Sequence, residues 1–400
     1  MNVSNKNSYK LPVVIAGLML ITTLNSCTKD HSLNTAVQEE SKGPEGYISQ
    51  FKGAKRAANP FIEVTVSDAK VLNNLLQSRK QNTVEILKDS VWTGGKTLFL
   101  RSTDIPAINP EIRKSIYLGA IIKGEEITDV SAIKPLLLPS SERNPITMYA
   151  TFITDSTSRE VAKPSPEADR SYLRDALKAG SGKQLSAFRF NMESFSRTNE
   201  LRLSFGANVN IGGILGITTT ENSVFSTKKT SVRVEFTQEN YSINIEPPLG
   251  LPFIKNMTDK TKFGLLDPMI VSSITYGRKG IMTFESDSNY EDVVKTLNII
   301  LKLPIPKLVS EGGKPLISAE IGLSKEQMSL LENSIMKVYV IGVNGKDVFK
   351  IVKGLEGFME ILATGQEFSP ETPGVPLFYT LNYVSDFSNY WNNFKVNIAN

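Results

Sequence analysis

The chain has 400 residues, of which 40% are hydrophobic and 22% are charged, a composition that suits one large or two ordinary globular domains. Its 45 basic and 41 acidic residues give a net charge of +4 and are spread along the sequence, which argues against nucleic acid as a partner. With a single histidine, His31, and a single cysteine, Cys27, the chain cannot assemble a Ser-His-Asp triad or a zinc site of the usual kind. We therefore expect no enzyme activity, no metal and no cofactor.

The N-terminus has the features of an export signal. Lys6 and Lys10 precede an apolar run over residues 11–24, which at about 14 residues is shorter than the roughly 20 that a spanning helix needs. The run is followed by the letters LNSC, so Cys27 stands where a bacterial lipoprotein signal places the acylated residue. We predict a lipoprotein signal peptide over 1–26, with an ordinary signal peptide or a chance apolar N-terminus as alternatives. The protein would then be an exported lipoprotein, either on the outer-membrane surface or secreted.

Beyond the signal, the pattern predicts a flexible tether and one folded core. Residues 27–58 are polar and lack periodicity, which is typical of a tether, and the core is expected over 59–400. The elements expected in chain order are a helix over 66–80, strands over 97–103 and 146–154, a polar break over 158–170, a helix over 171–180, and strands over 201–211, 231–245, 269–286, 336–343 and 376–387. Long strands with interspersed helices predict an α+β fold with a large antiparallel sheet.

Short motifs with catalytic potential are weak. The letters SVWTGGKT invite comparison with a phosphate-binding loop, but the first glycine of that loop would fall on Ser90. The paired acids Glu125 with Glu126, and Glu285 with Asp287, could serve a hydrolase, although solvated surface acids explain them as well. The sequence therefore offers no credible active site.

In two segments, apolar and polar residues alternate over lengths that suit membrane strands. The first crosses about seventeen residues, where a membrane strand needs roughly nine to eleven, and has no ionisable side chain between Leu203 and Thr220. Its candidate membrane-facing residues are Leu201, Leu203, Phe205, Val209, Ile211, Leu215 and Ile217. The second candidate set is Leu297, Ile299, Leu301 and Leu303, in an arm that should end or bulge near Pro304. Residues 316–334 fit a helix and a strand equally well. Half-buried strands of a soluble sheet explain the alternation too.

Several segments resemble the cholesterol-dependent, or thiol-activated, cytolysins and their wider cytolysin-like relatives. The similar segments, in order, are DSVWTGGKTLFL at 89–100, NELRLSFGANVN at 199–210, DPMIVSSITYGRKGIMTFES at 267–286, LLENSIMKVYVIGVNG at 330–345 and VPLFYTLNYVSDF at 375–387. The resemblance covers the chain from about residue 60 to its end. It implies an α+β core in which a twisted antiparallel sheet is flanked by helical bundles that convert to membrane hairpins.

The resemblance also implies a function. In such proteins many subunits close a β-barrel pore, and the hairpins would form from about 197–236 and about 287–334. A closed barrel leaves no unpaired strand edge in lipid. The partners would be a target membrane and further copies of the chain.

One departure concerns membrane recognition. The sequence shows neither the tryptophan-rich loop nor the C-terminal sandwich domain that cholesterol-binding members carry, so cholesterol recognition by that route is not expected. Docking would then depend on the acyl chain at Cys27 or on a partner. The chain resembles the short member of the short and long pairs in which cytolysin-like lipoproteins are thought to work.

The resemblance assigns oligomerisation residues as well. Gly342 matches the first glycine of a strand pair that admits a neighbouring subunit, but the second is Val343, and a plain β-bulge explains Gly342 equally. An intersubunit ion pair would fall near Glu193 and Lys353, each one residue away from the family register, and exposed charge is the alternative. Met336 stands where the family has an aromatic residue that stacks between subunits.

Two function classes remain open at this level. The first is an oligomerising pore former or one half of a two-component pore. The second is a non-lytic surface protein for binding, adhesion or decoy that retains the fold, which Pro304 and Pro306 favour.

Overall fold

The computed structural model describes residues 55–59, 61–66, 84–107, 110–128, 133–156, 158–180, 184–185, 187–194, 228–248, 251–256, 258–301, 322–343, 346–352, 367–370 and 372–399. All of them belong to one compact unit, residues 42–400. Most of the helix expected over 66–80, the signal peptide and Cys27 lie outside the described residues, and so does the stretch from Leu201 to Ile217.

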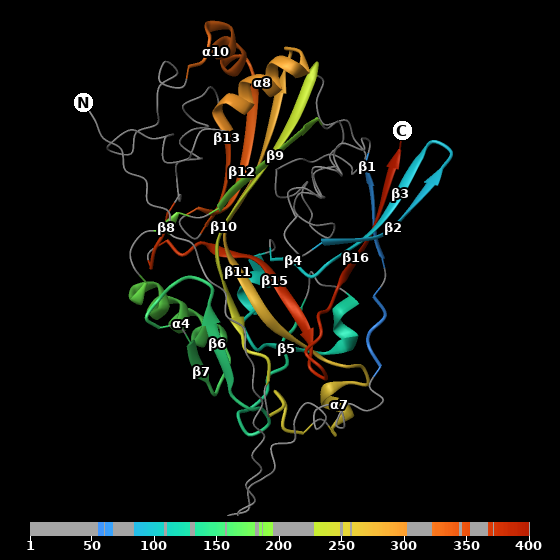
Figure 1. Cartoon of the computed structure of the whole chain (residues 1–400), viewed down its shortest axis with the longest axis vertical. Helices are drawn as coiled ribbons and strands as arrows, with labels where there is room; N and C mark the ends of the chain where they lie inside the picture. Colours follow the sequence, from blue (N-terminus) through green and yellow to red (C-terminus); the bar gives the residue numbers. More distant parts are fainter. Residues whose placement is uncertain are drawn as a thin grey trace, which may run out of the picture. The chain divides into compact units, whose positions relative to one another are not determined.

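Strands dominate the described chain (Figure 1). They are β1 (Phe61–Val66), β2 (Val84–Trp92), β3 (Gly95–Ser102), β4 (Ile105–Pro106), β5 (Ile121–Ile122), β6 (Ile146–Ala150), β7 (Ser158–Val161), β8 (Gln184–Leu185), β9 (Ala187–Ser194), β10 (Thr230–Ile245), β11 (Met269–Ser286), β12 (Ile335–Val343), β13 (Lys346–Val352), β14 (Glu367–Phe368), β15 (Val375–Tyr383) and β16 (Asn392–Ala399). The helices are α3 (Pro110–Ser115), η1 (Gly124–Thr128), α4 (Pro166–Ala179), α7 (Lys260–Phe263), α8 (Tyr290–Leu301) and α10 (Lys325–Glu332). No helix among these is long and apolar enough to cross a bilayer.

The strands form two main sheets, and the larger is antiparallel throughout. Its order is β13-β12-β11-β10-β6-β7, with β9 added to β10 and β15 to β11. The smaller sheet has the order β1-β16-β3-β2, in which β1 and β16 are parallel. The α+β class with a large antiparallel sheet is therefore confirmed.

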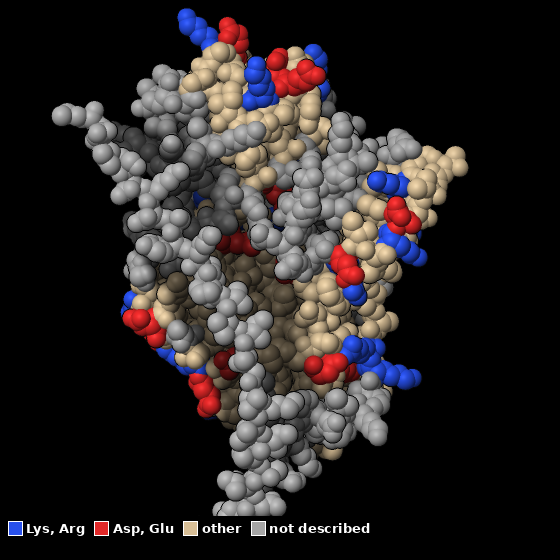
Figure 2. Space-filling view, viewed as in Figure 1, with Lys and Arg blue, Asp and Glu red and all other residues tan. Residues whose placement is uncertain are grey.

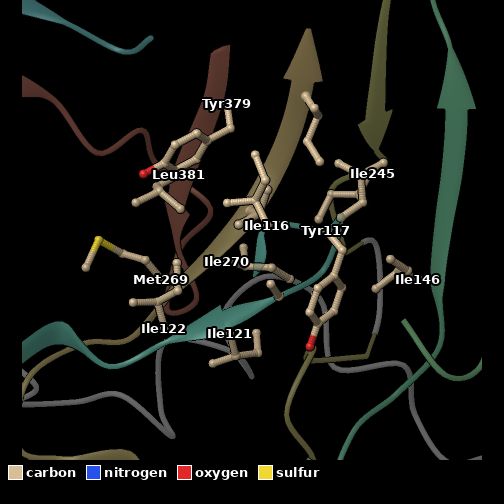
Figure 3. Close-up of a cluster of buried hydrophobic side chains, with 14 of the residues drawn as sticks. Ile116, Tyr117, Ile121, Ile122, Ile146, Ile245, Met269, Ile270, Tyr379 and Leu381 are labelled. Atoms are coloured by element: carbon tan, nitrogen blue, oxygen red, sulfur yellow. The ribbon is translucent and has the colours of Figure 1, made fainter. Parts of the chain in front are cut away.

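The long strand β11 changes its neighbour midway. From Met269 to Gly277 it pairs with β15, and from Lys279 to Glu285 it pairs with β12. The first half lies in a core that also contains β5, β6 and α4. Figure 3 shows this core around β5 and β11, with Ile121, Ile122, Ile146, Met269, Ile270, Tyr379 and Leu381 among its side chains.

Residues 158–170 are ordered, which corrects the break expected there. They contain β7 and the first turn of α4, which begins five residues before the expected start. The Ser165 hydroxyl caps the helix by accepting a hydrogen bond from the Ala168 N–H at 3.1 Å, and Pro166 occupies the first turn, where its missing N–H costs nothing. The Ser-Pro pair is therefore a helix start and not a loop.

The tether expected over 27–58 also needs correction at its end. Lys55 forms a parallel bridge with Leu266, and the Arg56 guanidinium lies 2.6 Å from the Asp386 carboxylate and 4.1 Å from the centre of the Tyr383 ring. At least residues 55–59 are therefore part of the core.

Asp169 of α4 joins the helix to the loop before β5. It is 4% exposed, and one carboxylate oxygen accepts a 2.7 Å hydrogen bond from the Leu118 N–H, while the other has no hydrogen-bond partner in the described part of the chain. Burial raises the pKa of this carboxyl from its ordinary value of 3.8 to about 8. The folded protein therefore holds a proton here that the unfolded chain releases.

We expect this proton to make stability fall as pH rises. Because the folded pKa is the higher one, the stabilisation is complete below about pH 4 and is lost as the pH approaches about 8. In Asp169→Asn, whose amide oxygen can still accept from Leu118, the loss should be absent. Urea unfolding of both proteins from pH 4 to 8 measures this, and parallel curves for the two would contradict it.

Candidate functional site

The second half of β11 lies in a five-stranded region with two edges. Its order is β9-β10-β11-β12-β13, and every neighbour is antiparallel. Among the described residues β9 pairs only with β10, and β13 only with β12. This region therefore presents β9 at one edge and β13 at the other, each able to pair with another strand.

Helix α8 covers one face of this region. Val293, Leu297, Ile300 and Leu301 are buried against apolar residues of three strands, which are Val232, Val234 and Phe236 of β10, Met282 and Phe284 of β11, and Met336, Val338 and Val340 of β12. The buried α8 positions follow the three- and four-residue spacing of one helix face. The same letters are amphipathic at helical spacing because Ile300 is apolar, and in this structure they form a helix. The membrane strand expected from Leu297, Ile299 and Leu301 stays a prediction.

Helix α10 follows on the same side and leads directly into β12. The Ser324 hydroxyl accepts from the Gln327 N–H, and the Gln327 side chain accepts from the Ser324 N–H, which makes a capping box. Leu330 and Leu331 pack in the same apolar cluster as α8. The segment expected as the second hairpin, 287–334, therefore has helices at both ends in the described residues.

The opposite face of the same strands carries buried charge. The Lys279 ammonium lies 2.5 Å from the Glu235 carboxylate, with the two side chains 3% and 10% exposed. Lys337 pairs with Glu285 at 3.1 Å, and Arg233 is 1% exposed. We call Arg233, Glu235, Lys279, Glu285 and Lys337 the charged layer.

The charged layer is costly for a folded protein. Among the described residues, one oxygen of Glu235 has no hydrogen-bond partner, and neither has the Thr283 hydroxyl between the two ion pairs. Taking ion pairs out of water costs several kcal/mol per ion, which their attraction offsets only in part. The sequence prediction missed this layer, and it corrects the interpretation of Glu285 as a solvated acid. The signal that was available is the placement of Arg233, Glu235, Lys279 and Glu285 at alternate positions of predicted strands.

A close crossing of backbones lies where β11 changes its neighbour. Gly342 has a φ of +88°, and a Cβ there would lie 2.7 Å from the Gly277 carbonyl oxygen. Gly374, just before β15, also has a positive φ and would place a Cβ 2.9 Å from the Gly277 Cα. Beside this crossing, burial lowers the pKa of the Arg278 guanidinium to about 10, and its Nε donates to the Gln238 amide oxygen at 2.5 Å. Three strands meet here without room for side chains on the glycines.

The predicted oligomerisation residues fall on the same region. Glu193 lies on the edge strand β9, opposite Arg233 of β10. Gly342 lies within the irregular pairing of β12 with β13 between Val340 and Val343, which is the bulge that was its alternative explanation. Met336 is fully buried against α8. Lys353 lies outside the described residues, directly after the last residue of β13, and Leu303 lies outside them as well.

The remaining sequence motifs have structural roles. The letters SVWTGGKT form the turn between β2 and β3, two antiparallel strands, and no helix follows as a phosphate loop requires. The Glu125 carboxylate accepts from the N–H groups of Leu265 and Leu266, at 2.5 and 2.9 Å. This acid therefore fixes a loop.

The fold and this helix-covered sheet define a cytolysin core. The family model of thiol-activated cytolysins matches residues 94–393, so the chain belongs to the thiol-activated cytolysin family.

Individual relatives agree with the family assignment. Listeriolysin O of Listeria monocytogenes (serotype 4a, strain HCC23) is 24% identical over 289 residues, which cover 70% of this chain and 48% of the relative. Ivanolysin of Listeria ivanovii is 22% identical over the same length. The chain thus spans about half the length of the curated relatives it matches.

Solved structures show the same fold. The crystal structure of listeriolysin O has a TM-score of 0.57 at 19% identity and covers 92% of this chain and 74% of its own. A non-hemolytic pneumolysin from Streptococcus pneumoniae strain ST306 has a TM-score of 0.61 at 16% identity and covers 90% of this chain and 74% of its own. Since a pneumolysin described as non-hemolytic shares the fold, the fold alone does not establish lysis.

Proposed function

We propose that this chain is the pore-forming core of a cytolysin, in which copies pair edge to edge and segments beside the sheet convert into membrane-crossing hairpins. The observation that carries the proposal is the position of α8 and α10. They lie between β11 and β12, which are already antiparallel neighbours joined by this one segment. Their conversion to strands would lengthen an existing hairpin and would need no new topology.

The existing register supports this conversion. The last pair of the β11–β12 ladder is Glu285 with Ile335. Continuing the same register would pair Leu297 with Leu323 and Ile299 with Ile321, so apolar residues would meet on one face. The odd-numbered positions of both arms would lie on that face, and they are apolar over residues 297–303 and 317–323.

The register of the first segment can be continued in the same way. The β9–β10 ladder ends at Ser194 with Val232, and its continuation would pair Leu201 with Phe225. Odd positions from Leu201 to Ile217 would then fall on the same sheet face as the odd positions of the second segment. Three of the four strands would thus share an apolar face of the kind that lipid contact requires, whereas the return arm of the first segment is more polar and would place Thr219, Glu221 and Ser223 on that face.

The two edges of the sheet support self-assembly. A monomer that presents β9 at one edge and β13 at the other can join its copies head to tail into a ring. Glu193 stands on the first edge and Lys353 directly follows the second, so an ion pair between subunits is part of the proposal.

A charge swap tests this contact. Glu193→Lys should prevent assembly of the oligomer, as should Lys353→Glu, because each places like charges across the interface. The double variant should restore assembly at low salt. Oligomers are counted on agarose gels in detergent; unimpaired assembly of both single variants would remove the ion pair from the proposal.

Export and pairing with a longer partner complete the proposal. Lipidation at Cys27 is supported by the letters LNSC after an apolar run, and it would hold the protein at a membrane surface. The chain would act either alone or as the short component beside a longer cytolysin-like partner.

Release of a dye from liposomes tests the function. The full chain with Cys27→Ser is added to sterol-containing and bacterial-type vesicles, with and without limited protease. Release together with large detergent-resistant oligomers is expected. If no mixture gave release or oligomers, including one with a longer partner, the result would favour a non-lytic binding protein. Pro304 and Pro306 favour that alternative because proline cannot donate a hydrogen bond to a neighbouring strand.

A further inference from the structure

The turn between β2 and β3 bears exposed apolar side chains outside the sheet region described above. Val91 is 80% exposed and Trp92 is 43% exposed. In Figure 2 the outer end of this hairpin is free of charged side chains, which gather further back along the strands. We call Val91, Trp92 and the turn residues Thr93 and Gly94 the hairpin tip.

The tryptophan of the tip is held in place by the protein. Its Nε1–H donates to the Thr97 hydroxyl at 3.1 Å, and that hydroxyl donates to the Asn397 amide oxygen at 2.8 Å. A Cβ on Gly95 would lie 2.8 Å from the indole, so the ring rests on the glycine turn. The indole thus exposes apolar surface while its one polar atom is satisfied internally, and it can enter an apolar phase without losing a hydrogen bond.

Cations flank the tip. Arg101 and Lys395 of the same small sheet are paired with Glu85 and Glu63. Lys88 and Lys96 have no ion-pair partner among the described residues. Of the acids of this hairpin, Glu85 is paired with Arg101, and Asp89 alone forms no ion pair with a described residue. The surplus is positive and complements anionic lipid headgroups.

The hairpin tip and α8 lie at corresponding ends of two strands that run in one direction. Strand β15 runs antiparallel to β11, and the chain then reverses, with an antiparallel bridge between Asn382 and Asn389. Strand β16 therefore runs in the direction of β11, as Figure 1 shows. The end of β16 pairs with Gly95 beside the tip, and α8 follows the corresponding end of β11.

We propose that the hairpin tip docks on the surface of an anionic phospholipid bilayer, with Val91 and Trp92 entering the interface beside the lysines. Tryptophan favours this depth of a bilayer, where its ring is apolar and its surroundings are mixed. The inference rests on the proposed function for the presence of a target membrane, but it concerns binding and not pore formation.

Fluorescence of the tip tests the proposal. The chain has two tryptophans, so Trp391→Phe in the full chain with Cys27→Ser leaves Trp92 as the reporter. With vesicles of phosphatidylcholine and phosphatidylglycerol, its emission should shift to the blue and be quenched by brominated acyl chains. With phosphatidylcholine alone the effect should be weaker.

Variants separate the tip from the rest of the surface. Val91→Ser with Trp92→Ser should weaken vesicle cosedimentation about tenfold or more, whereas Leu137→Ser, at an even more exposed leucine, should leave it unchanged. Circular dichroism of each variant confirms that it folds. The proposal would be overturned if the protein cosedimented with vesicles while the Trp92 emission stayed unchanged, or if it bound neither kind of vesicle. A blue shift of the emission that appears without vesicles and depends on protein concentration would overturn it as well. Dye release is recorded separately: binding through the tip without release would leave this inference intact and count against the pore.

Discussion

Replacing Lys279 with methionine is expected to lower the free energy of unfolding by about 3–5 kcal/mol, the cost of leaving one member of a buried ion pair without its partner. The ammonium lies 2.5 Å from the Glu235 carboxylate in the charged layer, and the second Glu235 oxygen already lacks a hydrogen bond from any residue that the structure describes. Methionine keeps the length of the side chain, so the loss reports on charge and not on volume. Denaturant titration at neutral pH measures it.

Two further variants make the origin of this loss testable. Lys279→Met combined with Glu235→Leu should recover most of the stability, because an apolar pair of similar volume is often equal to or better than a buried ion pair. Lys395→Met breaks an exposed pair with Glu63 and should cost no more than about 1 kcal/mol. If the double variant were as unstable as Lys279→Met alone, desolvation of the unpaired Glu235 carboxylate would not be the cause of the lost stability.

Gly342→Ala is expected to cost about 3 kcal/mol or more. A left-handed backbone costs a residue with a Cβ about 1–2 kcal/mol, and filling a site without space costs about 1–3 kcal/mol more. Both apply at Gly342, where φ is +88° and the Gly277 oxygen would lie 2.7 Å away.

Gly322 offers a matched control. Its φ is +79° and a Cβ there would meet no atom of the described residues within 4 Å, so Gly322→Ala should show the backbone cost alone. The difference between the two losses measures how tightly β12 crosses β11. Equal losses would mean that the crossing relaxes and does not constrain Gly342.

Much of the fold could be predicted because strand periodicity is local. Strand β10, whose residues Val232, Val234 and Phe236 alternate with polar ones, matches its prediction, and β11 matches over its whole length. The boundary of α4 could not be placed from apolar spacing, because its first turn is polar and is defined by the Ser165 cap. The α8 segment was ambiguous for a physical reason: Leu297, Ile300 and Leu301 fit a helix, and Leu297, Ile299 and Leu301 fit a strand.

The candidate site was predictable only in part. Gly342 and Glu193 could be assigned through the family resemblance and lie in the sheet region as expected, but their roles between subunits stay predictions. The charged layer depends on which residues of β10, β11 and β12 lie opposite each other in the sheet, and this register cannot be predicted from the sequence of any single strand. The hairpin tip could not be identified either, because the exposure of Val91 and Trp92 cannot be predicted from the residues around them.

The measurement that tests the central claim most directly is a cysteine scan of α8 with a polarity-sensitive dye, one position at a time from residue 296 to 301 in the Cys27→Ser chain. In solution the dye should follow the helix, with Ile300 more shielded than Ile299, since the first is fully buried and the second only partly. On membranes that the protein permeabilises, Leu297, Ile299 and Leu301 should report lipid and Ile300 should not, because a strand alternates its faces. A helical pattern that persists on those membranes would contradict the conversion of this segment into a hairpin.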